Sequence, residues 1–359
     1  MGCIRRLHSG WDARLFSASI PMKKLLLSTV ALAALLGHTF AAEYKAVPDW
    51  YKLAPGRPQM GNMHGDVAVS SSGDVYVSVM DPKAALQVYA SDGTFLRLVP
   101  DAPPDFHGFV IHKEAGGEFI YGARLGAGNI LKLTLDGKEV LNIPQTAIPD
   151  EFKNKVPKTT KKNAAGEVVP DPNEGKPFVR LTAMDVAPNG DLYVTDGYSS
   201  DYVHRFDKTG KYLKSFGGKK EPYGFKTLHK IAIDTRFDPP RIIGCDRANG
   251  RVVQMSLDGE FLGVIAKDML LPAAVAILGD LAVIGEIKGR VTMLDKAGNV
   301  VARFGTNTAE DEVGTNKTEP DKWKPGIVTA PHGVAFNAHG DVFVSEYNLY
   351  GRVHRFNRQ

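Results

Sequence analysis

The stretch HGVAFNAHGDVFVSEYNLYGRVHRF, residues His332–Phe356, shows the pattern that decides the fold. It opens with a histidine and a short apolar run, turns at Gly340-Asp341, continues as an alternating apolar run to an acidic residue, and ends near Arg-Val and an aromatic residue. A Gly-Asp pair between apolar runs indicates a β-hairpin, and β-branched and aromatic residues favour strands. The stretch therefore predicts a unit of antiparallel strands.

The same pattern occurs six times along the chain, mostly at spacings of 42 to 45 residues. The copies are Gly65–Tyr89, His107–Leu133, Met184–Phe206, His229–Met255, Ala273–Leu294 and His332–Phe356. A fourth strand is expected after the aromatic end, as at Tyr212–Gly217. Four short strands repeated at this period are typical of propeller blades. We therefore predict an all-β, six-bladed β-propeller, and the regular repeat argues against the alternative of a two-sheet β-sandwich.

Three further segments complete this prediction. The last copy ends after its third strand, so Glu43–Tyr51 is expected to supply the fourth strand, close the ring and remove free sheet edges. The polar, aperiodic segments Gln145–Val179 and Gly305–Thr329 are expected to form loops on one face.

The first 42 residues have the pattern of a targeting sequence. Two lysines after Met22 precede an apolar run, Leu25–Leu36, and small residues follow at Ala41-Ala42. This is typical of a secretory signal, and the apolar run is too short for a membrane span. We predict an upstream extension over 1–21, a cleaved signal peptide over 22–42, and a single secreted or periplasmic propeller domain over 43–359.

Charge and cysteine content exclude several classes of function. Residues 1–42 carry five of the 44 basic and one of the 40 acidic side chains, so 39 of each remain and the formal charge is zero. A net charge of zero does not favour binding to nucleic acid. No membrane span is expected after signal cleavage. Cys245 stands alone once Cys3 is removed, so we expect no internal disulfide. We also expect a monomer.

Three histidines, His107, His229 and His332, open the innermost strand in alternate copies, a position that we call the slot. Innermost strands line the central channel of a propeller, so the three rings are expected to meet there. Imidazole is a preferred zinc ligand, and three imidazoles with an open position form a catalytic site. The alternative is that each histidine merely bonds to a loop. The slots of the other copies hold Gly65 (with His64 one place earlier), Met184 and Ala273.

A tyrosine and an arginine are expected near this metal site. Tyr198 and Arg247 follow the second strands of copies three and four, at the same end of the channel. A tyrosine beside a dication has its phenolate favoured and can act as a base, and arginine suits bidentate capture of a carboxylate. We take both as candidate catalytic residues, with a loop aromatic and a pair with Asp246 as the alternatives. Weaker candidates are Tyr347, Tyr350 and Arg124.

These segments resemble NHL-repeat propellers. The relevant stretches are Val194–Ser200 (VTDGYSS), Lys214–Gly217 (KSFG) and Asp246–Val252 (DRANGRV). Combined with the slot histidines, they resemble more narrowly the peptidyl-α-hydroxyglycine α-amidating lyase, the lyase half of peptidylglycine α-amidating monooxygenase. The resemblance spans all six copies.

The resemblance implies a function and a set of roles. It implies Zn²⁺ on His107, His229 and His332, with Tyr198 as the catalytic tyrosine and Arg247 as an active-site arginine. The implied reaction cleaves the N–C bond of a carbinolamide and yields a primary amide and glyoxylate. The substrate would be a small molecule or peptide with a carboxylate, and a structural Ca²⁺ is a second implied metal.

The chain also departs from the family pattern. The acidic residue that follows the last zinc histidine in the family is replaced by Gly333, and the first-blade arginine is missing where the chain reads Ser78-Val79-Met80. Arg124 from the second copy is a candidate substitute. Two other functions stay open: a non-catalytic NHL propeller that binds a protein or peptide on its loop face, and a calcium lactonase-type propeller.

Overall fold

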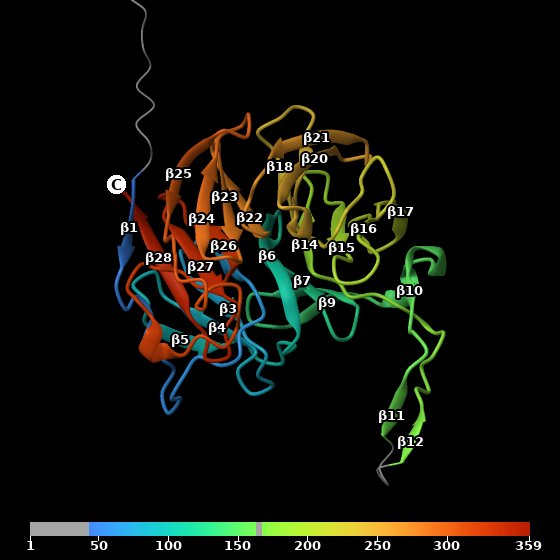
Figure 1. Cartoon of the computed structure of the whole chain (residues 1–359), viewed down its shortest axis with the longest axis horizontal. Coiled ribbons are helices and arrows are strands. Elements are labelled where there is room, and N and C mark those ends of the chain that lie inside the picture. Colours follow the sequence, from blue (N-terminus) through green and yellow to red (C-terminus); the bar gives the residue numbers. More distant parts are fainter. Residues whose placement is uncertain (1–42, 163–166) are drawn as a thin grey trace, which may run out of the picture. The chain divides into compact units, whose positions relative to one another are not determined.

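Six four-stranded antiparallel sheets follow one another along the chain (Figure 1). The computed structural model describes residues 43–162 and 167–359, and their regular structure is β-strand apart from four short 3-10 helices. Each sheet is one blade, so the predicted six-bladed β-propeller is confirmed. The predicted upstream extension and signal peptide, residues 1–42, lie outside the described residues.

Every blade is a meander of an inner, a second, a third and an outer strand. The inner strands are β2 (Val67–Val69), β6 (Phe106–Glu114), β14 (Ala183–Val186), β18 (Leu228–Asp234), β22 (Pro272–Leu278) and β26 (Pro331–Phe336). The second strands are β3 (Val75–Ser78), β7 (Gly117–Arg124), β15 (Leu192–Thr195), β19 (Arg241–Asp246), β23 (Leu281–Glu286) and β27 (Val342–Glu346). The third strands are β4 (Leu86–Tyr89), β8 (Ile130–Thr134), β16 (Tyr202–Phe206), β20 (Arg251–Ser256), β24 (Arg290–Leu294) and β28 (Val353–Arg358). The outer strands are β5 (Phe95–Leu98), β9 (Glu139–Ile143), β17 (Tyr212–Gly217), β21 (Phe261–Ala266), β25 (Val300–Phe304) and β1 (Tyr44–Val47).

The six inner strands form the hub of the ring. Each contacts the inner strands of the two neighbouring blades, and together they line one cavity of about 440 Å³. Side chains at corresponding positions of different blades therefore face the same channel.

The hydrophobic core lies between the blades. Six apolar clusters each combine residues of two neighbouring blades, as where Tyr76 of blade one and Phe109 of blade two belong to one cluster. Both faces of a blade are thus buried, which explains why the second strands are continuous apolar runs.

The first strand closes the ring, as predicted for Glu43–Tyr51. Strand β1 pairs antiparallel with β28, with Tyr44 opposite Arg358 and Val47 opposite Arg355. The sixth blade is therefore built from both ends of the described chain, and its outer edge is formed by an early segment (Figure 1).

The two insertions differ from each other. The prediction of structureless loop over Gln145–Val179 was wrong in part, because this segment contains short antiparallel pairs. They are β10 (Asn154–Lys155) with β13 (Pro177–Phe178), and β11 (Thr160–Lys162) with β12 (Val168–Pro170), preceded by the 3-10 helices η1 (Gln145–Ala147) and η2 (Asp150–Phe152). The second insertion contains only the 3-10 helix η4 (Pro320–Lys322).

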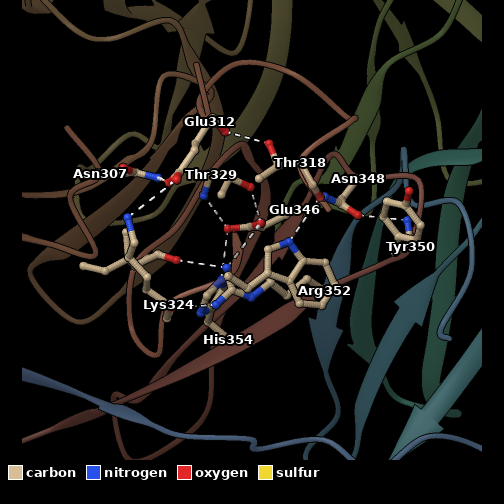
Figure 2. Close-up of polar contacts among 12 residues, drawn as sticks. Asn307, Glu312, Thr318, Lys324, Thr329, Glu346, Asn348, Tyr350, Arg352 and His354 are labelled. Carbon is tan, nitrogen blue, oxygen red and sulfur yellow. Dashed lines mark hydrogen bonds and ion pairs between the residues drawn. The ribbon is translucent and has the colours of Figure 1, made fainter. Parts of the chain in front are cut away.

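A buried network around Glu346 anchors the second insertion (Figure 2). The Glu346 carboxylate is fully buried, accepts the Thr329 N–H at 2.6 Å, and lies 3.0 Å from Nε2 of His354. Arg352 donates to the carbonyls of Ile327 and Lys324, at 3.0 and 2.7 Å. The network therefore holds the segment that leads directly to the slot residue of β26.

No helix among the described residues has the length and apolarity needed to cross a bilayer.

Candidate metal centre

A β-bulge presents each of the three slot histidines to the hub. The register between inner and second strand shifts at each position, and the shift leaves one residue without a strand partner: His107, His229 and His332. Blade five has the same shift at Ala273. Because a bulge re-aims the side chain of the extra residue, the repeat builds one inward-facing position per bulged blade.

Blade three does not have the predicted slot residue. Strand β14 has no register shift, Ala183 pairs directly with Thr195, and Thr182 donates its N–H to the Thr195 carbonyl. Thr182 therefore stands at the start of the inner strand, and Met184 packs in the core between blades two and three. The assignment of Met184 to the slot was wrong. Blade three lacks the extra, bulged residue, so aligning its apolar residues with those of the other copies shifts the slot to a wrong position.

The three histidine rings meet in the hub. Their centroids lie 4.9 Å apart for His107 and His229, 4.7 Å for His107 and His332, and 4.8 Å for His229 and His332. All three residues are buried. The structure thus brings together three side chains from blades two, four and six, as the slot pattern predicts.

Each ring is tied to the backbone of the following blade through Nδ1. The Nδ1 atoms of His107, His229 and His332 donate to the carbonyls of Thr182, Ala273 and Gly65, at 2.6, 2.6 and 2.8 Å. A carbonyl only accepts, so the proton of each neutral ring is on Nδ1 and the Nε2 lone pair is free. Metal-binding histidines have this arrangement, in which the second ring nitrogen donates to a carbonyl or carboxylate.

The surroundings keep these imidazoles neutral. Burial is the main cause that lowers the pKa of His107, His229 and His332 well below the ordinary value, and the charge of Arg247 lowers all three further. Since neutral imidazole is the form that binds metal, a metal ion would displace few protons here.

The hydroxyl of Tyr198 lies where the imidazoles point. Its Oη is 2.9 Å from Nε2 of His229 and 3.3 Å from Nε2 of His107, and it accepts a hydrogen bond from Nη1 of Arg247 at 3.0 Å. Burial raises the pKa of Tyr198, while the Arg247 charge and hydrogen bond act in the opposite direction. The five residues predicted for the site are therefore gathered in one place.

This cluster has fewer hydrogen-bond donors than buried imidazole nitrogens that need one. The single hydroxyl proton of Tyr198 can satisfy one imidazole lone pair, although His107 and His229 both present one. Nε2 of His332 is buried and has no hydrogen-bond partner among the described residues. Buried acceptors without donors are costly, and a cation satisfies several at once. The imidazole nitrogens fit as ligands of a metal that prefers nitrogen, such as zinc.

Two residues near the site were not assigned to it from the sequence. His64, in the loop before β2, has Nε2 3.2 Å from Tyr198 Oη, and its only signal was its place beside the slot of copy one. Arg180 accepts the Tyr198 N–H through its carbonyl at 3.4 Å. The positive charge of its exposed side chain adds to the burial that lowers the pKa of His64 and opposes the burial that raises the pKa of Tyr198. No local motif marks Arg180, because it lies in the loop before an inner strand.

Of the three weaker candidate residues, one lies in the cluster and two lie elsewhere. The Tyr347 ring lies 4.7 Å from that of His64, so it belongs to the cluster. Arg124 is paired with Asp105 at 2.6 Å and has no hydrogen bond or ion pair to the histidines in the described part of the chain. Tyr350 lies in the network of Figure 2, where its backbone N–H bonds to Asn348.

The space beside Gly333 is filled by an acidic residue from another blade. A Cβ atom on Gly333 would come within 2.4 Å of Oδ1 of Asp66, and the buried Asp66 carboxylate forms an ion pair with Lys230. Calcium takes six to eight oxygen ligands, whereas the nearest side-chain oxygens beside Gly333 are Ser345 Oγ and the carboxylate of Asp66, which already has a cationic partner. The residues here therefore do not fit the structural calcium ion that the resemblance implied.

Comparisons with known proteins agree with this architecture. No protein-family model matches the chain. Peptidyl-α-hydroxyglycine α-amidating lyase 1 of Drosophila melanogaster is 25% identical over 214 residues, which cover 52% of this chain and 36% of that protein. The match therefore spans about a third of that relative. The chain is a six-bladed β-propeller that is similar, over this stretch, to a protein named as an α-amidating lyase.

Solved structures show the same fold at low sequence identity. A streptogramin B lyase is 13% identical with a TM-score of 0.53, over 89% of this chain and 97% of that one. A gluconolactonase of Xanthomonas campestris is 11% identical with a TM-score of 0.56, over 88% and 97%. At these identities the two structures show the propeller fold and carry no information about the chemistry of the site.

Proposed function

We propose that the chain is a zinc-dependent lyase that cleaves an α-hydroxyglycine-type carbinolamide to a primary amide and glyoxylate. The observation that carries this proposal is the meeting of three carbonyl-tied imidazoles in the hub, where the Tyr198 hydroxyl lies within hydrogen-bonding distance of two of them and accepts a bond from Arg247. The similarity to a protein named as an α-amidating lyase supports this choice among metal-dependent reactions.

His107, His229 and His332 would hold the metal. When bound, zinc would lower the pKa of a substrate hydroxyl in contact with it. The remaining requirement is a group that moves one proton, because the reaction removes the hydroxyl proton, converts the C–O bond to a carbonyl and returns a proton to the departing nitrogen.

Tyr198 is placed to move that proton. Its Oη is fixed at 3.0 Å from Nη1 of Arg247, whose charge and hydrogen bond oppose the burial that raises the pKa of Tyr198. Oη would take the proton from the substrate hydroxyl and deliver it to the nitrogen as the N–C bond breaks. One residue would then serve as base and acid, and no additional proton donor is required.

Arg180 is the second arginine that we assign to substrate binding. Its exposed guanidinium has no hydrogen bond or ion pair within the described ranges, yet its charge acts on both His64 and Tyr198. We propose that it binds the substrate carboxylate in place of the missing first-blade arginine, since a guanidinium suits bidentate carboxylate binding.

The test combines metal analysis with product detection. Purified protein should contain one zinc per chain, and the metal-loaded protein should release benzamide and glyoxylate from N-benzoyl-α-hydroxyglycine. A protein that keeps zinc on the three histidines and releases neither product would overturn the lyase proposal and leave the non-catalytic propeller. A lactonase is not favoured, because imidazoles surround Tyr198 and, of the hub carboxylates Asp66 and Asp185, Asp66 already forms an ion pair with Lys230.

Export and oligomeric state remain predictions. N-terminal sequencing of protein recovered from the periplasm or medium should show a chain that starts near residue 43, and light scattering should show a monomer.

A further inference from the structure

A fourth imidazole faces the proposed metal site. The metal-ligating nitrogens of His64, His107 and His332 lie within 4.8 Å of one another. The His64 ring centroid is 4.7 Å from that of His107 and 4.9 Å from that of His332. His229 lies outside this tight group, but its Nε2 approaches the same Tyr198 oxygen as His64 does, at 2.9 against 3.2 Å. Four ring nitrogens therefore surround one region.

The backbone that carries His64 is held in place. Met63 donates its N–H to the Asn348 carbonyl at 2.7 Å and accepts the Asn348 N–H at 3.0 Å, and Met80 donates to the Asn62 carbonyl at 2.7 Å. The neighbouring Met63 side chain is fully buried. Blades one and six thus fix the position of the His64 Cα atom beside the hub.

The His64 side chain is held far less firmly than the other three. The rings of His107, His229 and His332 are each tied through Nδ1 to a carbonyl, whereas the hydrogen bond to Tyr198 is the only one of the His64 ring in the described part of the chain. His64 is also partly exposed, while the other three are buried. Turning this ring about its side-chain bonds would therefore break no hydrogen bond to the backbone, although the ring packs against those of His107, Tyr198, His332 and Tyr347.

We propose that His64 is a fourth, exchangeable ligand of the metal bound by His107, His229 and His332. Zinc with four protein ligands is a closed site, and catalytic zinc keeps one position for water or substrate. The untied ring of His64 would occupy that position in the resting protein and leave it when a substrate oxygen binds. The identity of that substrate rests on the proposed function, whereas the ligand assignment rests on the metal site alone.

Cobalt substitution tests this assignment without any assay of activity. Co²⁺ replaces Zn²⁺ in nitrogen sites, and its visible absorption bands report the number and type of ligands. We expect the wild type and His64→Ala each to bind one Co²⁺ per chain, with shifted bands in the variant because water replaces the ring nitrogen. The Co²⁺ affinity of the variant should be lower by roughly ten- to a hundredfold, the scale of changes made around metal ligands. Added imidazole should restore the wild-type bands in the variant.

Two matched variants and one ligand complete the experiment. His339→Ala removes an exposed histidine in the turn after β26, at the opposite end of that strand from His332, and should leave bands and affinity unchanged. His332→Ala should abolish stoichiometric binding. Glycolate, which offers a hydroxyl and a carboxylate, should convert the wild-type bands to those of His64→Ala with glycolate. His64→Gln with an intact far-ultraviolet spectrum guards against a folding defect.

The outcomes separate the two proposals. Identical bands and affinity in the wild type and His64→Ala would overturn the fourth ligand and leave the lyase proposal intact. A band shift with imidazole rescue but no glyoxylate release from N-benzoyl-α-hydroxyglycine would support His64 and overturn the lyase. Failure of the wild type to bind Co²⁺ or Zn²⁺ would overturn both.

Discussion

At the scale of the residue, the chemistry of the site depends on which ring nitrogen carries the proton. Three carbonyls of alternate blades accept from Nδ1, so all three Nε2 lone pairs are directed toward one region. The carbonyls belong to the backbone of Thr182, Ala273 and Gly65, in the three blades that have no slot histidine. The non-histidine copies of the repeat therefore contribute as much to the site as the histidine copies, through the backbone.

Removal of one oxygen atom tests the role of Tyr198. We expect Tyr198→Phe to lower kcat for carbinolamide cleavage by about 10² to 10⁴, the usual contribution of a positioned acid or base. Zinc content should stay at one per chain, because the metal ligands are the histidines. Tyr212→Phe, which removes a hydroxyl bonded to Ser215 in the outer strand of the same blade, is the control and should retain activity. A kcat for Tyr198→Phe within threefold of the wild type would contradict the assignment.

The repeat pattern explains why most of the site could be predicted. His107, His229 and His332 share one slot, so the ring symmetry alone predicts that they meet. Tyr198 and Arg247 follow second strands and share their end of the hub. His64 and Arg180 lie in loops before inner strands, where no periodicity applies, and only the folded chain places them.

At the scale of the element, Glu346 links the second insertion to the hub. Burial alone would raise the pKa of this carboxyl, but its hydrogen bonds with His354 and Thr329 and the charge of Arg352 hold it below its ordinary 4.5. A carboxylate with a lowered folded-state pKa stabilises the fold above its ordinary pKa, and this contribution is lost as the pH falls through the lowered value.

We therefore expect Glu346→Gln to lower the free energy of unfolding by about 1–3 kcal/mol at pH 7, because buried groups lose a charged partner. The difference from the wild type should shrink as the pH falls below about 4.5, and urea titrations across this range measure it. Glu319→Gln, at an exposed position of the same insertion, should follow the wild-type curve. A difference that stays constant with pH would show that ionisation of Glu346 does not contribute.

The contact between β26 and blade one makes Gly333 a steric requirement. A methyl group at this position would approach Asp66 Oδ1 to 2.4 Å and Ser345 Oγ to 2.5 Å. We expect Gly333→Ala to cost about 1–3 kcal/mol, the usual price of overpacking, in thermal or urea unfolding. Gly279→Ala is the comparison, because no atom lies within 4 Å of a Cβ placed on Gly279. In that variant only the left-handed backbone conformation disfavours alanine. Unchanged stability of Gly333→Ala would mean that Asp66 moves aside freely.

At the scale of the whole molecule, the proposed metal joins three blades that are far apart in sequence. Its ligands come from β6, β18 and β26, and β1 closes the ring on β28. Unfolding of any of these blades would separate the ligands, so metal binding should stabilise the ring as a unit. The closure by β1 could be predicted because the sixth copy lacks an outer strand. The strand pairs inside Gln145–Val179 could not, because they are too short for a periodic signal.

Removal of the metal by a chelator measures how much metal binding stabilises the folded ring. A ligand that binds only the folded state adds RT ln(1 + [L]/Kd), or about 2.7 kcal/mol at a free concentration of 100 Kd. We expect removal of zinc by a chelator to lower the melting temperature by several degrees in differential scanning calorimetry. A variant with alanine at His107, His229 and His332 should melt at the same temperature with or without chelator. An equal shift in this variant would mean that the chelator acts elsewhere on the chain. A shift confined to the wild type would locate the stabilising metal between blades two, four and six, where its binding energy holds the ring closed.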